Sequence, residues 1–180
     1  MRKFEELVIS ISNILNKLEI SHFFTGAIAT SYWGKPRTTT DIDIVWEPSN
    51  IKELYKELKK INLDCDESII MEALESKGNL VILDKISPYR IDFLPPQAEQ
   101  LKRRKLVMLL NINIWLVSPE DLIIMKVIYG REKDRIDIMH IIYIQGDKLD
   151  YKYIQENIEK LGLKHIYNDI LKKIESKDNQ

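Results

Sequence analysis

Two aspartates separated by a single residue, Asp41 and Asp43, form the pattern in this sequence with the clearest chemical meaning. They open residues 41–46, a run that is typical of a strand with one polar and one apolar face. Side chains two residues apart on a strand point to the same face, so both carboxylates lie on one side. Two anions this close repel each other unless a cation lies between them. We therefore expect Mg²⁺ here, because it prefers oxygen ligands and keeps positions for water and phosphate.

A third acid, Asp92, lies in residues 90–94, a second strand-like run. Ile91 and Phe93 are expected to point into the core and Asp92 away from it. If this strand neighbours residues 41–46, three carboxylates converge in the arrangement that can hold two metal ions. The alternative is that these acids are simply solvated on the polar face of a strand, which is the ordinary interpretation of an isolated Asp-x-Asp.

The residues before the paired acids favour a phosphate site. Gly26 begins a predicted helix directly after a strand, and backbone N–H groups at a helix N-terminus bind phosphate. Arg37 can pair with a phosphate oxygen. Thr40, the last of three consecutive threonines, brings a hydroxyl next to the acids. Each feature alone is ordinary, but together they are typical of a triphosphate site.

Residues 24–44 resemble the signature of the DNA polymerase β-type nucleotidyltransferase superfamily. That signature is a glycine and a small residue, a spacer, two acids around a hydrophobic residue, and a third acid on a later strand. The resemblance implies that Asp41, Asp43 and Asp92 are catalytic metal ligands and that Gly26 and Ala27 contact the nucleotide. Ala27 stands where the family usually has Gly or Ser, so a hydroxyl contact to phosphate is lost while the backbone N–H remains.

Residues 118–138 are similar to the helical segment of minimal nucleotidyltransferases, a branch that includes the abortive-infection type IV toxins. In that branch a helix lysine and a following Lys-Asp or Arg-Asp pair belong to the active site. The resemblance implies that Lys126 is a catalytic residue that holds the triphosphate and that Asp134 orients it or a neighbouring base. By the residues alone, Lys126 is a lone cation among apolar neighbours, and the ordinary expectation is that its side chain extends to the surface.

Together, these resemblances imply an enzyme that uses two Mg²⁺ ions to transfer a nucleoside monophosphate from a nucleoside triphosphate to an acceptor, with release of pyrophosphate. RNA or tRNA, a protein side chain and a small molecule would all need the same metal site, so the acceptor stays open. The first alternative is a non-catalytic nucleotide-binding module of the same fold, or one half of a toxin–antitoxin pair with an antitoxin as partner. A second alternative is an interaction scaffold whose acids are surface residues.

Hydrophobic periodicity and turn signals predict the elements that must position these residues. Helices are predicted over residues 3–19, 27–33, 51–61, 67–76 and 98–105, and strands over 22–24, 41–46, 79–84, 89–94 and 112–117. Asn50 and Glu53 predict a capping box for the helix at 51–61. Ser118 followed by a proline predicts a helix start. Helices are expected from there to the C-terminus, with breaks near Gly130, Gly146 and Gly162.

The expected fold class is therefore α+β: a small mixed sheet of the polymerase β-like nucleotidyltransferase type, flanked by helices and followed by a C-terminal helical region. We expect a catalytic α/β domain at residues 1–117. The helical region at residues 118–180 is expected to complete the active site.

The composition narrows the class of protein. Hydrophobic residues make up 44% of the 180 residues, which is enough for a core. The net charge of -1 does not by itself indicate a nucleic-acid partner, and the basic run at 102–105 is either a solvated helix face or an RNA contact. No run approaches the roughly 18 apolar residues of a membrane span. Cys65 is the one cysteine, which excludes an internal disulfide, so a cytoplasmic location is expected.

Overall fold

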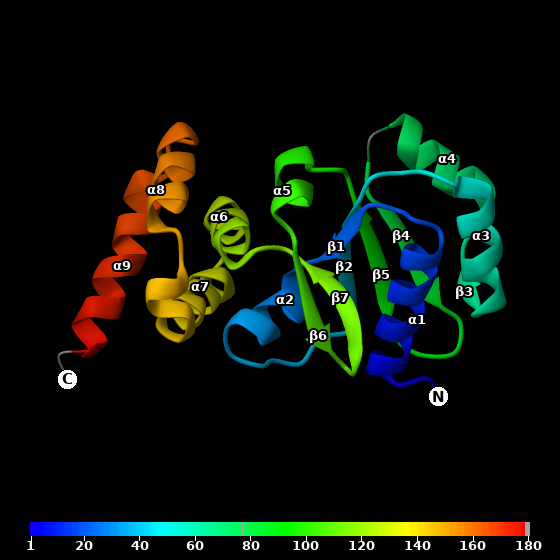
Figure 1. Cartoon of the computed structure of the whole chain (residues 1–180), viewed down its shortest axis with the longest axis horizontal. Helices are drawn as coiled ribbons and strands as arrows, with labels where there is room; N and C mark the ends of the chain where they lie inside the picture. Colours follow the sequence, from blue (N-terminus) through cyan, green and yellow to red (C-terminus); the bar gives the residue numbers. More distant parts are fainter. Residues whose placement is uncertain (77, 179–180) are drawn as a thin grey trace. The chain divides into compact units, whose positions relative to one another are not determined.

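The computed structural model of the chain describes residues 1–76 and 78–178 and contains two compact units. Residues 1–28 and 38–117 form the first, which we call the sheet unit. Residues 29–37 and those from 118 onward form the second, which we call the helical unit. Figure 1 shows the elements of both along the chain.

The described part of the sheet unit contains one mixed sheet of seven strands in the order β3-β4-β5-β2-β1-β7-β6. The strands are β1 (His22–Phe24), β2 (Asp41–Trp46), β3 (Leu63–Asp64), β4 (Leu80–Asp84), β5 (Arg90–Leu94), β6 (Lys105–Leu109) and β7 (Ile112–Leu116). β2 pairs with β5 and β1 pairs with β7 in parallel, and the other neighbours are antiparallel.

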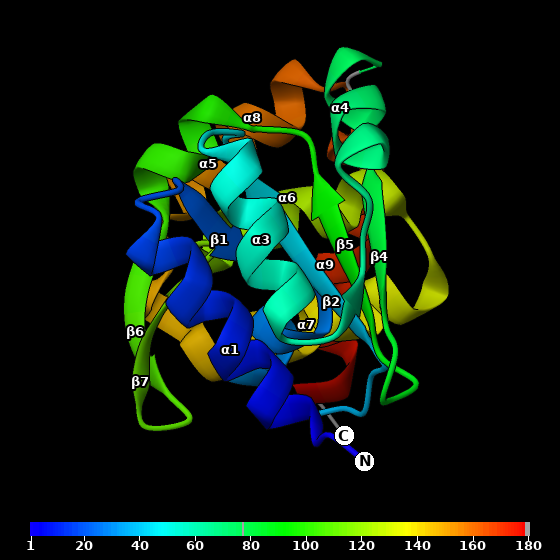
Figure 2. The ribbon, with the colours of Figure 1, turned by 90° about the vertical axis from the view of Figure 1, so that its right-hand side faces the viewer.

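Helices α1 (Phe4–Lys17) and α3 (Ile51–Lys60) lie in front of the strands in Figure 2. Both helices are amphipathic, and their apolar stripes are buried. The core between helices and sheet consists of fully buried aliphatic and aromatic side chains, among them Leu7, Ile11, Leu15, Leu54, Leu58, Ile42, Ile44, Ile91 and Phe93. The helices α4 (Glu67–Glu75) and α5 (Ala98–Arg103) complete this unit.

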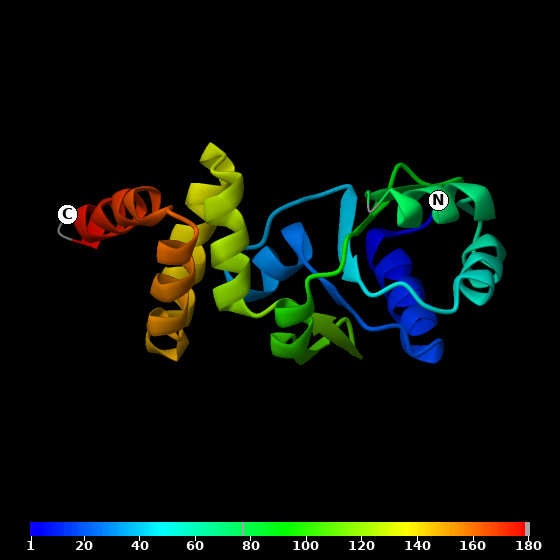
Figure 3. The ribbon, with the colours of Figure 1, turned by 90° about the horizontal axis from the view of Figure 1, so that it is seen from above.

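The helical unit is built on α6 (Pro119–Tyr129), α7 (Glu132–Gln145), α8 (Tyr151–Lys160) and α9 (Lys164–Asp178), with a short 3-10 turn at Gly146–Lys148. The part of Figure 3 coloured from yellow-green to red is helical throughout. α6 contacts α7 and α8, and α9 contacts the same two helices, so the four helices surround a common core. Helix α2 (Gly26–Trp33) begins in the sheet unit and ends in the helical unit.

The predicted α+β class is confirmed, and most predicted elements lie where the sequence places them. Ser118 caps α6 by accepting a hydrogen bond from the Asp121 backbone N–H at 3.1 Å. Gly130, in a left-handed conformation with φ 65°, ends the same helix. None of the helices in the described residues is both long enough and apolar enough to cross a membrane.

Two local predictions are wrong, and two strands were not predicted. Asn50 has φ 52° and makes no side-chain cap; its amide donates instead to the Leu18 carbonyl at 2.9 Å, so there is no capping box. The helix predicted to reach residue 105 ends at Arg103, and Lys105 begins β6, a strand that the sequence did not predict. The two-residue strand β3 was also not predicted.

Candidate functional site

The central strands of the sheet unit bring the three predicted acids together. β2 and β5 are parallel neighbours, and their register sets Asp43 opposite Asp92 and Asp41 opposite Arg90. Paired positions on neighbouring strands project from the same face of a sheet. The carboxylates of Asp41, Asp43 and Asp92 therefore share one face, while the intervening Ile42 is buried on the other.

Gly26 lies directly against one of these acids. A Cβ atom at Gly26 would be 1.9 Å from Oδ2 of Asp43, and the φ of Gly26 is +56°, a conformation that residues with side chains avoid. The adjoining backbone is fixed to the same strand, because the Thr25 N–H donates to the Asp43 carbonyl at 2.9 Å. A residue other than glycine would therefore displace the carboxylate or the backbone.

Threonine hydroxyls fix the beginning of β2. The Asp41 N–H donates to Thr39 Oγ1 at 3.1 Å, and Thr40 Oγ1 donates to Asp41 Oδ1 at 3.4 Å. Thr40 is exposed, as a ligand contact requires. Ala27 is 3% exposed, so its methyl group packs into the protein interior.

Arg90 is a member of this site that sequence reasoning missed. Its Nη2 lies 2.9 Å from Asp92 Oδ2 and 3.6 Å from Asp41 Oδ1. The charge of Asp92, and then that of Asp41, raises the pKa of the Arg90 guanidinium. The sequence signal was its spacing, because a residue two positions before Asp92 on a strand shares its face.

The donor set suits Mg²⁺ chemically, because three carboxylates supply the hard oxygen ligands that this ion prefers. Oδ1 of Asp92 is buried and has no hydrogen-bond partner among the described residues. Within residues 1–76 and 78–178, no three His, Cys, Asp or Glu side chains are grouped as they would be around a bound metal ion. Instead, Arg90 supplies the positive charge between Asp41 and Asp92.

The helical unit holds a second charged cluster, centred on Lys126. This side chain does not extend to the surface: Lys126 is 3% exposed, and its Nζ lies 2.7 Å from Asp137 Oδ2 and 3.4 Å from Asp134 Oδ1. The two aspartates are three residues apart on α7 and therefore share a helix face. Asp137 is the second residue that sequence reasoning missed, and this spacing from Asp134 was its signal.

Two arginines complete the Lys126 cluster. Arg131 contacts Asp134, with Nε 2.5 Å from Oδ2, and Arg37 Nε lies 3.6 Å from Asp137 Oδ2. Burial opposes ionisation of Asp134, but hydrogen bonds from Arg131 and the charge of Lys126 outweigh it and lower the pKa of that carboxyl. The cluster holds three cations and two carboxylates, and its Arg37 side chain is 34% exposed.

The structure thus divides the predicted residues between two places. Asp41, Asp43 and Asp92 share one face of the sheet unit, and Gly26 lies against Asp43. Ala27 follows Gly26 in the chain, and Thr40 precedes Asp41. Lys126, Asp134 and Arg37 meet in the helical unit through Asp137.

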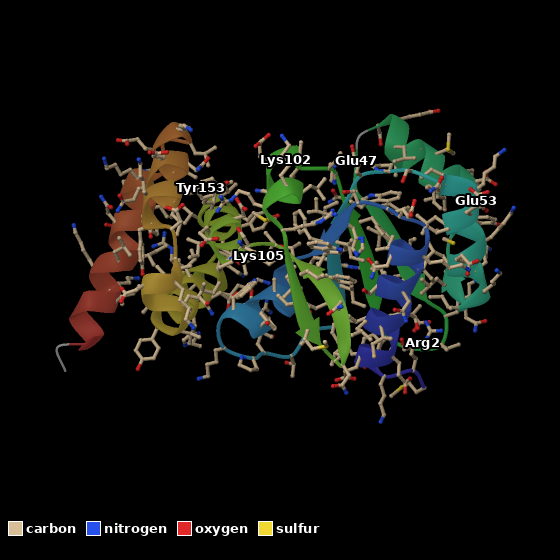
Figure 4. The ribbon with its side chains drawn as sticks, viewed as in Figure 1. Arg2, Glu47, Glu53, Lys102, Lys105 and Tyr153 are labelled. Carbon is tan, nitrogen blue, oxygen red and sulfur yellow. The ribbon has the colours of Figure 1, made fainter. Side chains whose placement is uncertain are left out.

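A cavity of about 240 Å³ lies elsewhere in the sheet unit. It is lined by Ser21, Glu47, Pro96, Ala98, Leu101 and Lys102, of which Glu47 and Lys102 are labelled in Figure 4. Glu47 follows the last residue of β2, four residues beyond Asp43, which is roughly 13 Å along an extended strand. This cavity is therefore distinct from the acid-bearing end of the strand.

The comparison with protein families gives one match. Residues 26–175 match a family described as "Nucleotidyltransferase of unknown function (DUF6036)". The matched span includes the Gly26 turn, all three acids and the Lys126 cluster. No curated protein matches the sequence.

Several solved structures share the fold at low sequence identity. The solution structure of the antibiotic-resistance factor ANT(2'')-Ia has a TM-score of 0.60 at 12% identity, over 97% of this chain and 96% of that chain. The lincomycin-bound lincosamide antibiotic adenylyltransferase LnuA has a TM-score of 0.57 at 13% identity, over 80% and 98%. An antigenic nucleotidyltransferase-like protein from Paracoccidioides brasiliensis has a TM-score of 0.56 at 17% identity, over 95% and 92%. At these identities the similarity establishes the fold.

Proposed function

Because the chain belongs to the nucleotidyltransferase family DUF6036, we propose that it transfers a nucleoside monophosphate from a nucleoside triphosphate to a hydroxyl acceptor in a Mg²⁺-dependent reaction. The observation that carries this proposal is the register of β2 and β5, which sets Asp43 opposite Asp92 with Asp41 on the same face. Gly26 supports the proposal, because the absence of a side chain at this position allows its backbone to lie against Asp43.

In the proposed site, Asp41 and Asp43 would hold one Mg²⁺ ion, and Asp43 and Asp92 would hold a second. Bound Mg²⁺ supplies charge neutralisation at the phosphate oxygens. Arg90 lies beside Asp92 Oδ2 and would compete with a bound ion for this carboxylate.

Asp92 takes the proton of the acceptor hydroxyl in this proposal, since its carboxylate lies on the same face as Asp41 and Asp43 and its side chain is partly exposed. The acceptor oxygen forms a bond to the α-phosphorus while the bond from that phosphorus to the pyrophosphate oxygen breaks. The products are a phosphodiester of the acceptor and pyrophosphate, and the proton rests on Asp92 until it passes to water. Positioning and charge neutralisation supply most of the acceleration of such a transfer.

We further propose that backbone N–H groups at Gly26 and Ala27, together with Thr40, Arg37 and Lys126, bind the triphosphate. The Arg37 side chain is 34% exposed, whereas that of Lys126 is 4% exposed. Arg37 is therefore the more accessible of these two cations for a phosphate oxygen, and Lys126 adds its positive charge to a cluster in which cations outnumber carboxylates.

The deciding experiment measures nucleotide binding and pyrophosphate release with the full chain, Mg²⁺ and each of the four ribonucleoside triphosphates. ATP is tested first, because LnuA is an adenylyltransferase. A cell extract supplies the acceptor. We expect heat of binding with one triphosphate and release of pyrophosphate that stops when Mg²⁺ is chelated.

The variants Asp41→Asn, Asp43→Asn and Asp92→Asn should fold and lose at least a hundredfold in rate. Glu53→Gln is the matched control, because Glu53 is an exposed acid on α3 (Figure 4) and lies outside the site. Full activity of Asp92→Asn would contradict the proposal. Binding without pyrophosphate release would favour the non-catalytic module, and no binding at all would favour a scaffold.

A cytoplasmic location is part of the proposal. Cys65 is a free, buried thiol, and burial raises its pKa, so the chain uses its one cysteine for packing and not for a disulfide.

A further inference from the structure

We infer that the acceptor is a hydroxyl-bearing small molecule with an aliphatic face and no phosphate group, and that Val81 and Leu83 of β4 form its subsite beside Asp92. This inference rests on the proposed function, because it takes Asp92 as the residue that receives the acceptor's proton. It starts from the strand next to β5 on the side away from β2.

The sheet register places these two aliphatic side chains in line with the site. β4 pairs with β5 so that Val81 lies opposite Asp92 and Leu83 lies opposite Arg90. The register of β5 with β2 continues the first row to Asp43. Val81, Asp92 and Asp43 therefore form one row across three strands and project from the same face.

Both aliphatic side chains are exposed, one strand away from the acids of β5. Val81 is 49% and Leu83 is 54% exposed, whereas Leu80 and Ile82, which alternate with them, are 2% and 0% exposed. The open face of an antiparallel strand is ordinarily polar. Residues 80–83 of β4 are aliphatic on both faces. Half-buried Leu94, two residues after Asp92 on β5, lies on the same face as Val81 and Leu83, and we call these three side chains the apolar strip.

The charges of this part of the sheet favour an acceptor without phosphate groups. Residues 80–94 contain two cations, and each is already paired: Lys85 with Asp64 at 2.9 Å and Arg90 with Asp92 at 2.9 Å. RNA binding depends on cations that neutralise the phosphate backbone. An uncharged or cationic acceptor suits a strip bordered by carboxylates.

The dense basic run of the chain is engaged elsewhere. Lys102 pairs with Glu99 at 2.9 Å, and the Arg104 guanidinium stacks on the Trp115 ring at 4.4 Å. These residues belong to α5 and to the β6–β7 end of the sheet, whereas β4 lies toward the opposite edge in the strand order.

The spacing of the strip limits the shape of the acceptor. Neighbouring strands are roughly 4.8 Å apart, so an acceptor whose hydroxyl reaches the Asp92 carboxylate has Val81 one strand spacing away. The aliphatic part of the acceptor must therefore lie only a few bonds from the reacting hydroxyl.

The test supplies labelled α-phosphate triphosphates to the full chain together with a cell extract separated into RNA, protein and small-molecule pools. We expect label in the small-molecule pool, in a product that resists ribonuclease and protease. The variant Val81→Ser/Leu83→Ser should raise the KM for that pool by roughly tenfold or more and leave triphosphate binding unchanged. The conservative variant Val81→Ile/Leu83→Met should keep the wild-type KM.

The control is Leu106→Ser/Met108→Ser on β6, where two aliphatic side chains are 51% and 64% exposed but lie away from the acids in the strand order. This variant should match the wild type. Label in RNA or protein, no label despite triphosphate binding, or an unchanged KM in the Val81→Ser/Leu83→Ser variant would overturn the inference. If the wild-type chain fails to bind any triphosphate, the proposed function itself has failed.

Discussion

Gly26 and Asp43 approach each other so closely that a Cβ atom on the glycine would lie 1.9 Å from the carboxylate oxygen. The first residue of α2 thus meets the second acid of β2 with no room for a side chain between them. The positive φ of Gly26, +56°, is a second and independent requirement for glycine.

Gly26→Ala should therefore impair both stability and transfer. The left-handed backbone costs about 1–2 kcal/mol with an alanine, and the added methyl group pushes Asp43 out of line with Asp92. Thermal denaturation and pyrophosphate release measure the two effects. Gly162→Ala separates them, because Gly162 has φ +71° with nothing within 4 Å of a Cβ atom. It should lose similar stability and keep full activity; equal losses of activity in both variants would contradict the assignment of Gly26.

Arg90→Met should strengthen Mg²⁺ binding to the sheet unit. The guanidinium competes with any cation for Asp92 and Asp41, which it contacts at 2.9 and 3.6 Å. Since the Arg90 side chain is 45% exposed and screened by water, we expect a modest gain, about fivefold in the dissociation constant. Calorimetric titration with Mg²⁺ measures it, with Arg90→Lys as the charge-preserving control. Weaker Mg²⁺ binding by Arg90→Met would mean that Arg90 supports the site and does not compete with the ion.

Asp137→Asn should destabilise the helical unit. Asp137 is the carboxylate nearest Lys126, at 2.7 Å, and Lys126 Nζ is buried. Breaking a buried ion pair from one side costs about 3 kcal/mol or more. Hydrogen exchange of the α6 and α7 amides should accelerate accordingly. Glu156→Gln is the control, because it removes an exposed ion pair in which Lys152 Nζ lies 3.9 Å from Glu156 Oε1. Loss of this pair should have little effect on stability.

His22 should make the stability of the sheet unit depend on pH. Burial, and then the nearby charge of Arg104, lower the pKa of His22 to about 4, although a hydrogen bond to the Ile20 carbonyl opposes this shift. The folded chain therefore holds this imidazole neutral while the unfolded chain protonates it near pH 6.5. Above pH 6.5, His22 should make no pH-dependent contribution to the free energy of unfolding. As the pH drops from 6.5 to 4, this free energy should fall by up to about 3 kcal/mol.

Urea unfolding between pH 8 and 4 measures this dependence. His22→Phe should remove it, whereas His165→Gln, at an exposed position, should leave it unchanged. If the pH dependence of the free energy of unfolding persists in His22→Phe, other titratable groups cause it.

Local patterns in the sequence were sufficient for much of the site. The alternation in residues 41–46 and 90–94 placed Asp41, Asp43 and Asp92 on polar strand faces, because a strand has a side-chain period of two. Ser118 and Gly130 marked both ends of α6 through their capping chemistry. These features depend on residues within one turn or one strand.

Features that depend on distant partners were missed. β6 is a short apolar run whose strand character shows only in its pairing with β7, through a turn at Leu110 and Asn111 with φ of 55° and 61°. Leucine in such a turn gives no sequence signal, since glycine or asparagine is usual there. The Asn50 side chain does not cap α3, and its amide donates instead to the carbonyl of Leu18, which follows α1 and is 32 residues away in the chain.

By itself, the sequence determined which acids are candidates for the site and which face of each strand they occupy, because side-chain alternation repeats along a few consecutive residues. Only the tertiary structure decided that Asp43 faces Asp92, that Arg90 lies between the acids, that Val81 continues the row, and that Lys126 is buried between two aspartates. The physical reason is that strand register and buried ion pairs are set by packing between segments far apart in the chain, which no local pattern encodes.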